Sequence, residues 1–149
     1  MRIRSARPGE AGLLTGIALR AKAYWGYDEA FMAACREELT LDAAALERAS
    51  VAEDGARVVG FAVLTGAPPS GELDMLFVEP DRIGHGIGRA LFEQVRDRAR
   101  AAGLRRFTID ADPNAEPFYL AMGAVRIGST VSDSIPGREL PLLEVDLAP

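Results

Sequence analysis

The chain has 149 residues, of which 48% are hydrophobic, and a formal net charge of −5 at neutral pH. This length predicts one domain covering residues 1–149 around a single core. The acidic balance argues against a nucleic-acid partner, and no apolar run approaches the roughly 20 residues of a membrane-spanning helix. The chain starts without a signal-peptide pattern, and its one cysteine, Cys35, has no disulfide partner within the chain. We therefore expect a cytoplasmic protein with no membrane partner.

In the first half of the chain, the patterns predict a strand, then helices, then a hairpin. Alternation over residues 2–6 is typical of a strand, and apolar residues at helical spacing follow it. The pair Asp54-Gly55 is a strong turn signal and predicts a hairpin. The expected helical segments are 13–24, 31–35 and 43–48, and the expected hairpin strands are 51–53 and 57–65.

In the second half, a strand at 72–78 runs into a glycine-rich turn and then a long helix. Apolar residues within 87–99 lie on one face of that helix, and Gly103 is suited to end it. We predict a short helix capped by Asn114, with Pro117 in its first turn, where the N–H groups lack partners anyway. The remaining expected strands are 106–111, 124–131 and 139–147.

The turn at 84–88, Gly-His-Gly-Ile-Gly, joins a strand directly to the start of a helix. Glycine backbone next to the free N–H groups of a helix N-terminus forms a seat for phosphate or pyrophosphate. A dinucleotide fingerprint needs glycine at its sixth position, where this chain has Arg89, and a P-loop needs Gly-Lys-Ser/Thr, which is also missing. A tight turn without a ligand is the alternative that the glycines alone leave open.

Two stretches of the chain together resemble the GNAT superfamily of N-acetyltransferases. Leu73-x-x-Leu76-x-Val78-x-Pro80 and the glycines resemble its acyl-CoA-binding core, and the stretch 114–123, with Phe-Tyr and a closing Gly, resembles its second signature. The resemblance implies an α/β fold: a central mixed, mostly antiparallel sheet of about six to seven strands, flanked by helices, with a splayed strand pair that holds CoA. One departure is Ile83, where the family usually has Arg or Gln; Arg82 lies one residue early.

The resemblance implies acetyl-CoA as co-substrate, bound along the end of the strand at 72–78, the glycine turn and the short helix. A single histidine and a single cysteine form no recognisable zinc site, so we expect no metal. The expected CoA-contacting residues are Leu76, Phe77, Val78, Ile83, Gly84, His85, Gly86, Ile87, Gly88, Arg89, Asn114 and Tyr119.

Acetyl transfer to an amine needs a donor to the thioester oxygen, a base for the amine and an acid for the leaving thiolate. Tyr119 is the candidate acid, because a phenol with pKa near 10 suits a thiol leaving group and its position resembles that of the family's catalytic tyrosine; core packing is the alternative. Glu72 and Asp74 are candidate bases, since residues two apart on a strand share a face, and a solvated strand face is the alternative. The resemblance also implies a backbone N–H near Leu76 or Phe77 as the oxyanion donor.

The segment between the first two expected helices is aromatic and acidic. The resemblance implies that this segment lines the acceptor site, and core packing of the aromatic rings is the alternative. Its candidate acceptor-binding residues are Tyr24, Trp25, Tyr27 and Asp28. Together with the two strand carboxylates, they favour a small cationic amine as acceptor.

The expected function is N-acetyl transfer from acetyl-CoA to the primary amine of such a small molecule, by direct attack in a ternary complex. A non-catalytic CoA-binding regulatory domain with the same fold is the alternative from another class. A nucleotide-binding switch domain is a third, disfavoured by the failed dinucleotide and P-loop spacings. The sequence leaves open which amine is the acceptor, the length of the acyl group, whether water is the base, and whether the chain forms a homodimer.

Overall fold

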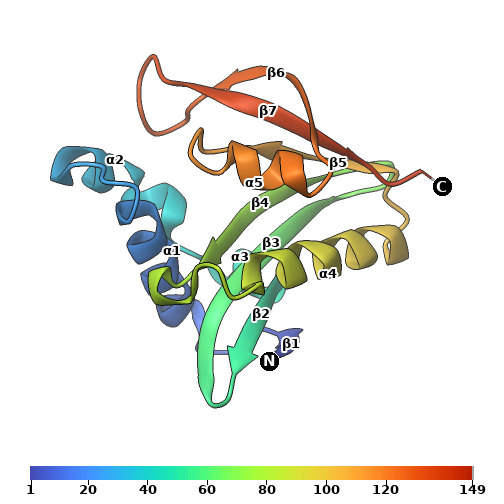
Figure 1. Ribbon diagram of the computed structural model, residues 1–149, viewed down its shortest axis with the longest axis horizontal. Helices are drawn as coiled ribbons and strands as arrows, with labels where there is room; N and C mark the ends of the chain where they lie inside the picture. Colours follow the sequence, from blue (N-terminus) through green and yellow to red (C-terminus); the bar gives the residue numbers. More distant parts are fainter. Residues whose placement is uncertain (149) are drawn as a thin grey trace.

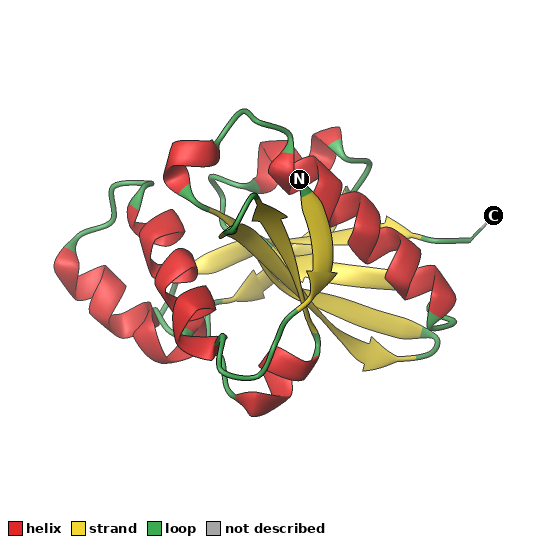
Figure 2. Cartoon of the chain, turned by 90° about the horizontal axis from the view of Figure 1, so that it is seen from below, coloured by secondary structure: helices red, strands yellow, loops and turns green. Residues whose placement is uncertain are grey.

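A seven-stranded mixed sheet, with helices on both faces, forms the framework of the computed structural model, which describes residues 1–148 (Figures 1 and 2). The strand order is β1-β2-β3-β4-β5-β7-β6, and all neighbours are antiparallel except β4 and β5. This arrangement confirms the predicted fold class. The strands are β1 (Arg2–Ser5), β2 (Ala49–Asp54), β3 (Arg57–Ala67), β4 (Ser70–Val78), β5 (Arg106–Asp110), β6 (Val125–Val131) and β7 (Glu139–Asp146).

The helices divide between the two faces of the sheet and bury separate cores. Leu14 and Ile17 of the first helix pack with Phe61 on one face, whereas Phe92 and Val95 of the longest helix belong to the core on the other. No helix within residues 1–148 is long and apolar enough to span a membrane. The helices are α1 (Ala11–Ala23), α2 (Glu29–Leu39), α3 (Ala43–Glu47), α4 (Ile87–Ala101) and α5 (Glu116–Ala121), and a short 3-10 turn, η1, spans Pro80–Arg82.

The sheet opens between β4 and β5. These parallel strands pair only where residues 70–72 meet residues 106–108, and beyond that point they diverge (Figure 1). The second half of β4 therefore keeps β3 as its neighbour on one side and has an open edge on the other. The opening between β4 and β5 lies in the middle of the sheet, where helices from both faces can contribute to one site.

A bulge in β4 lies next to the opening. The register of β3 and β4 pairs Leu64 with Leu73 and Val63 with Met75, so that Asp74 is the extra residue. A bulge of this kind interrupts the alternation of a strand. Leu73 packs into the core beneath α4 and α5, whereas Met75 packs against the core of α1 and α2.

Most predicted elements are present, but one predicted cap is wrong. Gly103, at φ +84°, follows the end of α4 as expected, and the hairpin turns at Gly55. Asn114 does not cap α5: the residue before this helix is Ala115, and no side chain caps it. The N–H groups of Asn114 instead donate to the Asp112 carboxylate, which draws the asparagine out of the capping position.

Candidate active site

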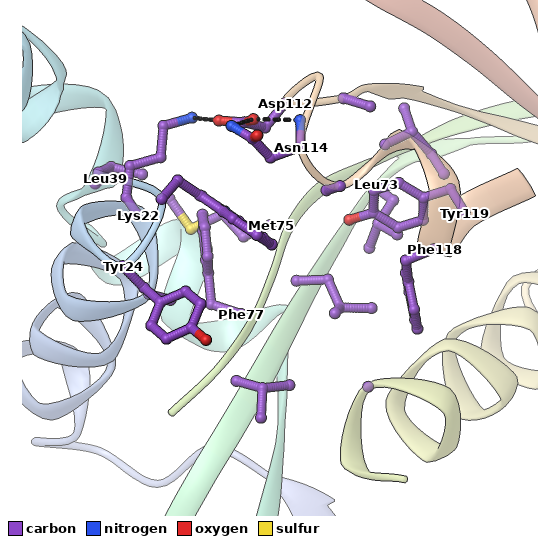
Figure 3. Close-up of a pocket in the computed structure, with 18 of the residues that line it drawn as sticks. Lys22, Tyr24, Leu39, Leu73, Met75, Phe77, Asp112, Asn114, Phe118 and Tyr119 are labelled. Atoms are coloured by element: carbon purple, nitrogen blue, oxygen red, sulfur yellow. Dashed lines mark hydrogen bonds and ion pairs between the residues drawn. The ribbon is translucent and has the colours of Figure 1, made fainter. Parts of the chain in front are cut away.

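A cavity of about 450 Å³ runs through the opening between β4 and β5 (Figure 3). Its lining changes character along its length: Gly84, Gly86 and Gly88 lie at one end, and Leu73, Leu76 and the ring of Tyr119 form the middle. Charged side chains from α1, from the end of β5 and from the loop before β7 line the other end. The cavity therefore connects a backbone-rich end to a charged end through an apolar passage.

The glycine turn leaves open space around its backbone. Gly84 and Gly86 have φ of +85° and +78°, and a Cβ added at either would meet no atom within 4 Å. Gly86 precedes the first residue of α4, so the first N–H groups of this 15-residue helix face the turn. Ile83 and His85 are exposed, and Arg89 pairs on the surface with Glu93. The backbone, rather than these side chains, supplies the donors at this end.

Arg82 is a cavity-lining side chain at the same end. Its Nε atom is buried without a hydrogen-bond partner, and its guanidinium lies 4.0 Å from Asp54. Sequence reasoning placed the family's usual arginine position at Ile83, whose side chain is exposed although it also borders the cavity. The positive charge next to the glycine turn thus comes from Arg82, the residue before Ile83.

The open edge of β4 presents alternate main-chain groups to the cavity. The N–H of Glu79 donates to the Val59 carbonyl, which fixes the phase of the antiparallel β3–β4 ladder. By that alternation the main-chain groups of Phe77 face β3, and those of Leu76 and Val78 face the gap. Of the two residues expected near an oxyanion donor, Leu76 has the N–H that points toward the cavity.

Tyr119 is 6% exposed, and its hydroxyl points into the cavity (Figure 3). The ring packs against Phe118 and Phe92, with centroids 5.2 and 6.1 Å away. Burial, reinforced by the negative charge of Asp112, raises the pKa of Tyr119 well above that of a free phenol. The phenol is therefore a protonated donor at neutral pH, held in one place by aromatic packing.

Glu72 and Asp74 line a second cavity, of about 490 Å³, on the side of the sheet that carries α2 and α3. Partial desolvation raises the pKa of both carboxyls, although Asp74 is an exposed residue, and the nearby Asp110 raises both further. Asp74 also lines the first cavity, whereas Glu72 does not. The acidic residues around the second cavity are Glu37, Glu38, Asp42, Glu72, Asp74, Asp110 and Asp133, with Arg48 as the cation among them.

The four residues expected at the acceptor site lie in different places. Tyr24 and Trp25 are exposed and line the first cavity, with their rings 5.6 Å apart. The Tyr27 hydroxyl donates to Asp112 at 2.9 Å. Asp112 lines the charged end of the cavity, whereas Tyr27 does not. The side chain of Asp28 accepts the N–H of Phe31 and caps α2, which keeps it out of the cavity lining.

Lys22 and Asp112 line the charged end of the cavity and were not found from the sequence. Lys22 lies 2.7 Å from Asp112, and Arg138 lies 3.6 Å from the same oxygen. Burial alone would raise the pKa of Asp112, but Lys22 and hydrogen bonds from Asn114 and Tyr27 hold it below its usual value. Within residues 1–148 no group of three potential ligands is arranged to hold a metal ion.

Comparison with known proteins agrees with this geometry. A family model described as an acetyltransferase (GNAT) domain matches residues 21–134. Peptidyl-lysine N-acetyltransferase YjaB of Salmonella typhimurium is 36% identical over 87 residues, which make up 58% of this chain and 55% of that protein. The chain thus matches about half the length of this curated relative.

Solved structures cover nearly the whole chain. A GCN5-related N-acetyltransferase from Rhodopseudomonas palustris has a TM-score of 0.78 and 26% identity, covering 98% of this chain and 95% of its own. The PaiA N-acetyltransferase from Thermoplasma acidophilum, solved with coenzyme A, has a TM-score of 0.80 at 16% identity, covering 97% and 98%. Because the family model covers more than half of the chain, the chain belongs to the GNAT acetyltransferase family, a class of acyl-CoA-dependent N-acyltransferases.

Proposed function

We propose that this protein transfers an acetyl group from acetyl-CoA to a primary amine of a small cationic acceptor. The observation that carries the proposal is the continuous cavity, which joins the glycine turn to the buried hydroxyl of Tyr119 and to the carboxyl of Asp74. Its order of groups matches the order that the reaction needs: an anion seat, an acid for the leaving group, and a base for the amine.

The glycine turn and the open edge of β4 fit the two halves of CoA. The free N–H groups at the start of α4, with open space around Gly84 and Gly86, suit a pyrophosphate. The gap-facing main-chain groups of Leu76 and Val78 suit the amide groups of the pantetheine arm, because an extended ligand can pair with a strand edge. Arg82 supplies a positive charge beside the pyrophosphate.

In the reaction, a new N–C bond forms between the amine and the acetyl carbon, and the thioester C–S bond breaks. Asp74, directly or through water, takes the proton that the ammonium group must lose before attack. The Leu76 N–H donates to the thioester oxygen as negative charge develops there. Tyr119 donates its proton to the leaving CoA thiolate, and the second proton that the attacking nitrogen must lose returns to the phenolate, so the products are the amide and CoA thiol.

The acidic second cavity supports a cationic acceptor. Asp74 and Asp110 line both cavities, so a positively charged molecule that reaches the thioester passes carboxylates on its way. Burial raises the pKa of Asp110 as well, and the negative charges of Asp133 and Glu38 raise it further, a repulsion that a bound cation would relieve. Glu72 contributes to this attraction from the second cavity.

A lysine side chain of a peptide is a second acceptor class, because the similar Salmonella protein is named a peptidyl-lysine N-acetyltransferase. It also presents a primary ammonium group. The exposed rings of Tyr24 and Trp25 at the cavity mouth could border such a peptide as readily as a free amine.

The deciding experiment measures release of free CoA thiol from acetyl-CoA with a panel of amines, including polyamines, basic amino acids and lysine peptides. We expect amine-dependent thiol release, with cationic acceptors faster than anionic ones. CoA binding without release for any amine would favour the non-catalytic alternative. Preferential binding of ATP or NAD over CoA would favour a nucleotide switch instead.

A further inference from the structure

Two cations lie at the charged end of the cavity, away from the glycine turn. Lys22 comes from α1 and Arg138 from the loop between β6 and β7, and both line the cavity. Their side chains are only 13% and 17% exposed. Holding two cations at so little exposure is costly unless negative charge compensates them.

One carboxylate serves both cations. Asp112 Oδ2 lies 2.7 Å from Lys22 Nζ and 3.6 Å from Arg138 Nη2. Asp112 also accepts hydrogen bonds from the backbone and side chain of Asn114, at 2.8 and 3.0 Å, and from the Tyr27 hydroxyl at 2.9 Å. Burial and Asp112 both raise the pKa of Tyr27, which keeps this phenol neutral. These direct contacts therefore join two positive charges to one negative charge, while Glu38, which lines the same cavity, accepts a hydrogen bond from Ser134 instead.

The guanidinium of Arg138 is fixed by aromatic rings rather than by a second acid. It lies 5.2 Å from the ring centre of Tyr27 and 4.8 Å from that of Phe31, and its Nη2 donates to the Tyr27 hydroxyl at 2.7 Å. Among residues 1–148 the buried side-chain polar atoms without a partner belong to Arg82 and Gln94. The remaining N–H groups of Arg138 are therefore accessible. A rigid guanidinium with spare donors on a cavity wall suits a carboxylate, which it can bind through two parallel hydrogen bonds.

We infer that Lys22 and Arg138 bind a carboxylate of the acceptor, which is then a small basic amino acid of the lysine or ornithine class. This inference rests on the proposed function for the acetyl donor and for the ammonium group that reacts. The acceptor carboxylate neutralises the excess positive charge of the cluster. Its ammonium group lies toward Asp74 and Asp110, which line the same cavity. The bonds formed and broken in the transfer are unchanged.

Matched acceptors that differ only in the carboxylate test the inference. L-lysine is compared with cadaverine, and L-ornithine with putrescine, by thiol release from acetyl-CoA. We expect kcat/KM to be roughly 10- to 100-fold higher for the amino acid of each pair, the range for hydrogen bonds to a charged group. Equal rates within each pair overturn the inference and leave the proposed function standing. If none of the amines gives thiol release, the proposed function is overturned. In that case, calorimetric binding of lysine and cadaverine to the CoA-saturated protein still decides the inference.

Variants of the cluster supply the second arm of the test. Arg138→Met leaves Lys22 and Asp112 as a one-to-one pair, so the cluster becomes neutral and the fold should hold. We expect the preference for the amino acid to fall to near one, and Arg138→Lys to restore part of it. Arg126→Met is the matched control, since it removes an arginine of β6 that is 52% exposed. A preference that survives Arg138→Met, or that Arg126→Met also removes, overturns the inference.

Discussion

Tyr119 combines a buried ring with a hydroxyl that opens on the cavity. Removal of that hydroxyl in Tyr119→Phe should lower kcat by about 10²-fold, the lower end of the range for loss of a general acid, and leave the KM for acetyl-CoA unchanged. Steady-state kinetics with saturating amine measure both. An unchanged kcat, when chemistry limits the rate, would assign Tyr119 to packing alone.

The raised pKa of Asp74 gives a second prediction for single residues. A base must be deprotonated, so kcat/KM should fall as the pH drops through a pKa above the ordinary aspartate value near 3.9. Asp74→Asn should lower kcat and remove this acid limb from the pH profile. Glu72→Gln is the matched control, because Glu72 borders the second cavity alone, and it should change acceptor KM more than kcat. If the acid limb persists in Asp74→Asn, another group is the base.

At the scale of elements, the junction between β4 and α4 depends on the left-handed backbone of Gly86. Gly86→Ala should weaken acetyl-CoA binding by about tenfold, because the left-handed conformation costs a residue with a Cβ roughly 1–2 kcal/mol and the turn relaxes away from it. Gly12→Ala in α1 is the control: Gly12 has a helical backbone and open space, so alanine should be neutral or stabilising there. Calorimetric titration with acetyl-CoA measures the difference, and equal affinities in the two variants would contradict the assignment of this turn.

A second junction ties β1, β2 and the start of α1 together through Arg4. Its guanidinium bonds both oxygens of Glu10 and one oxygen of Glu53. The hydrogen bond from Arg4 lowers the pKa of Glu10 from 4.5 to about 2. Because the folded pKa is the lower one, this stabilisation is fully present above pH 4.5 and is lost as the pH falls toward 2.

Glu10→Gln should therefore lower the free energy of unfolding by roughly 1–2 kcal/mol at pH 7, and the loss should shrink as the pH falls from about 5 to 3. Urea unfolding at several pH values measures this change. Glu93→Gln is the control, since Glu93 forms an exposed pair with Arg89 and should cost less than about 0.5 kcal/mol. A loss that does not vary with pH would mean that Glu10 acts through something other than its charge.

At the scale of the whole molecule, local patterns predicted the framework because each one spans few residues. The glycines at 84–88 and the helical spacing after them predict a turn followed by a helix from neighbouring residues alone. The Asp54-Gly55 pair likewise specifies a hairpin with no help from distant contacts. The expectation for Tyr119 came from its place in a short motif, and the structure puts its side chain in the cavity.

What the sequence did not reveal depends on distant neighbours. Lys22, Asp112 and Arg138 are far apart along the chain, and no local pattern marks them as partners. The bulge at Asp74 arises from the β3–β4 register, which alternation within β4 alone does not determine. The expected cap at Asn114 failed because its own N–H groups donate to the Asp112 carboxylate, two residues earlier, and the Glu116 N–H donates to the Asp112 carbonyl.

The open edge of β4 has a consequence for how fast its amide protons exchange with solvent. Along this strand, alternate N–H groups bond to β3, and the ones between them face the cavity. In the free protein, Phe77 should exchange slowly, at a rate set by opening of the sheet, whereas Leu76 and Val78 should exchange fast. Bound acetyl-CoA should slow the fast pair far more than their neighbour, which residue-resolved NMR exchange can measure. Successive amides of one strand would then report separately on the stability of the sheet and on occupancy of the cavity.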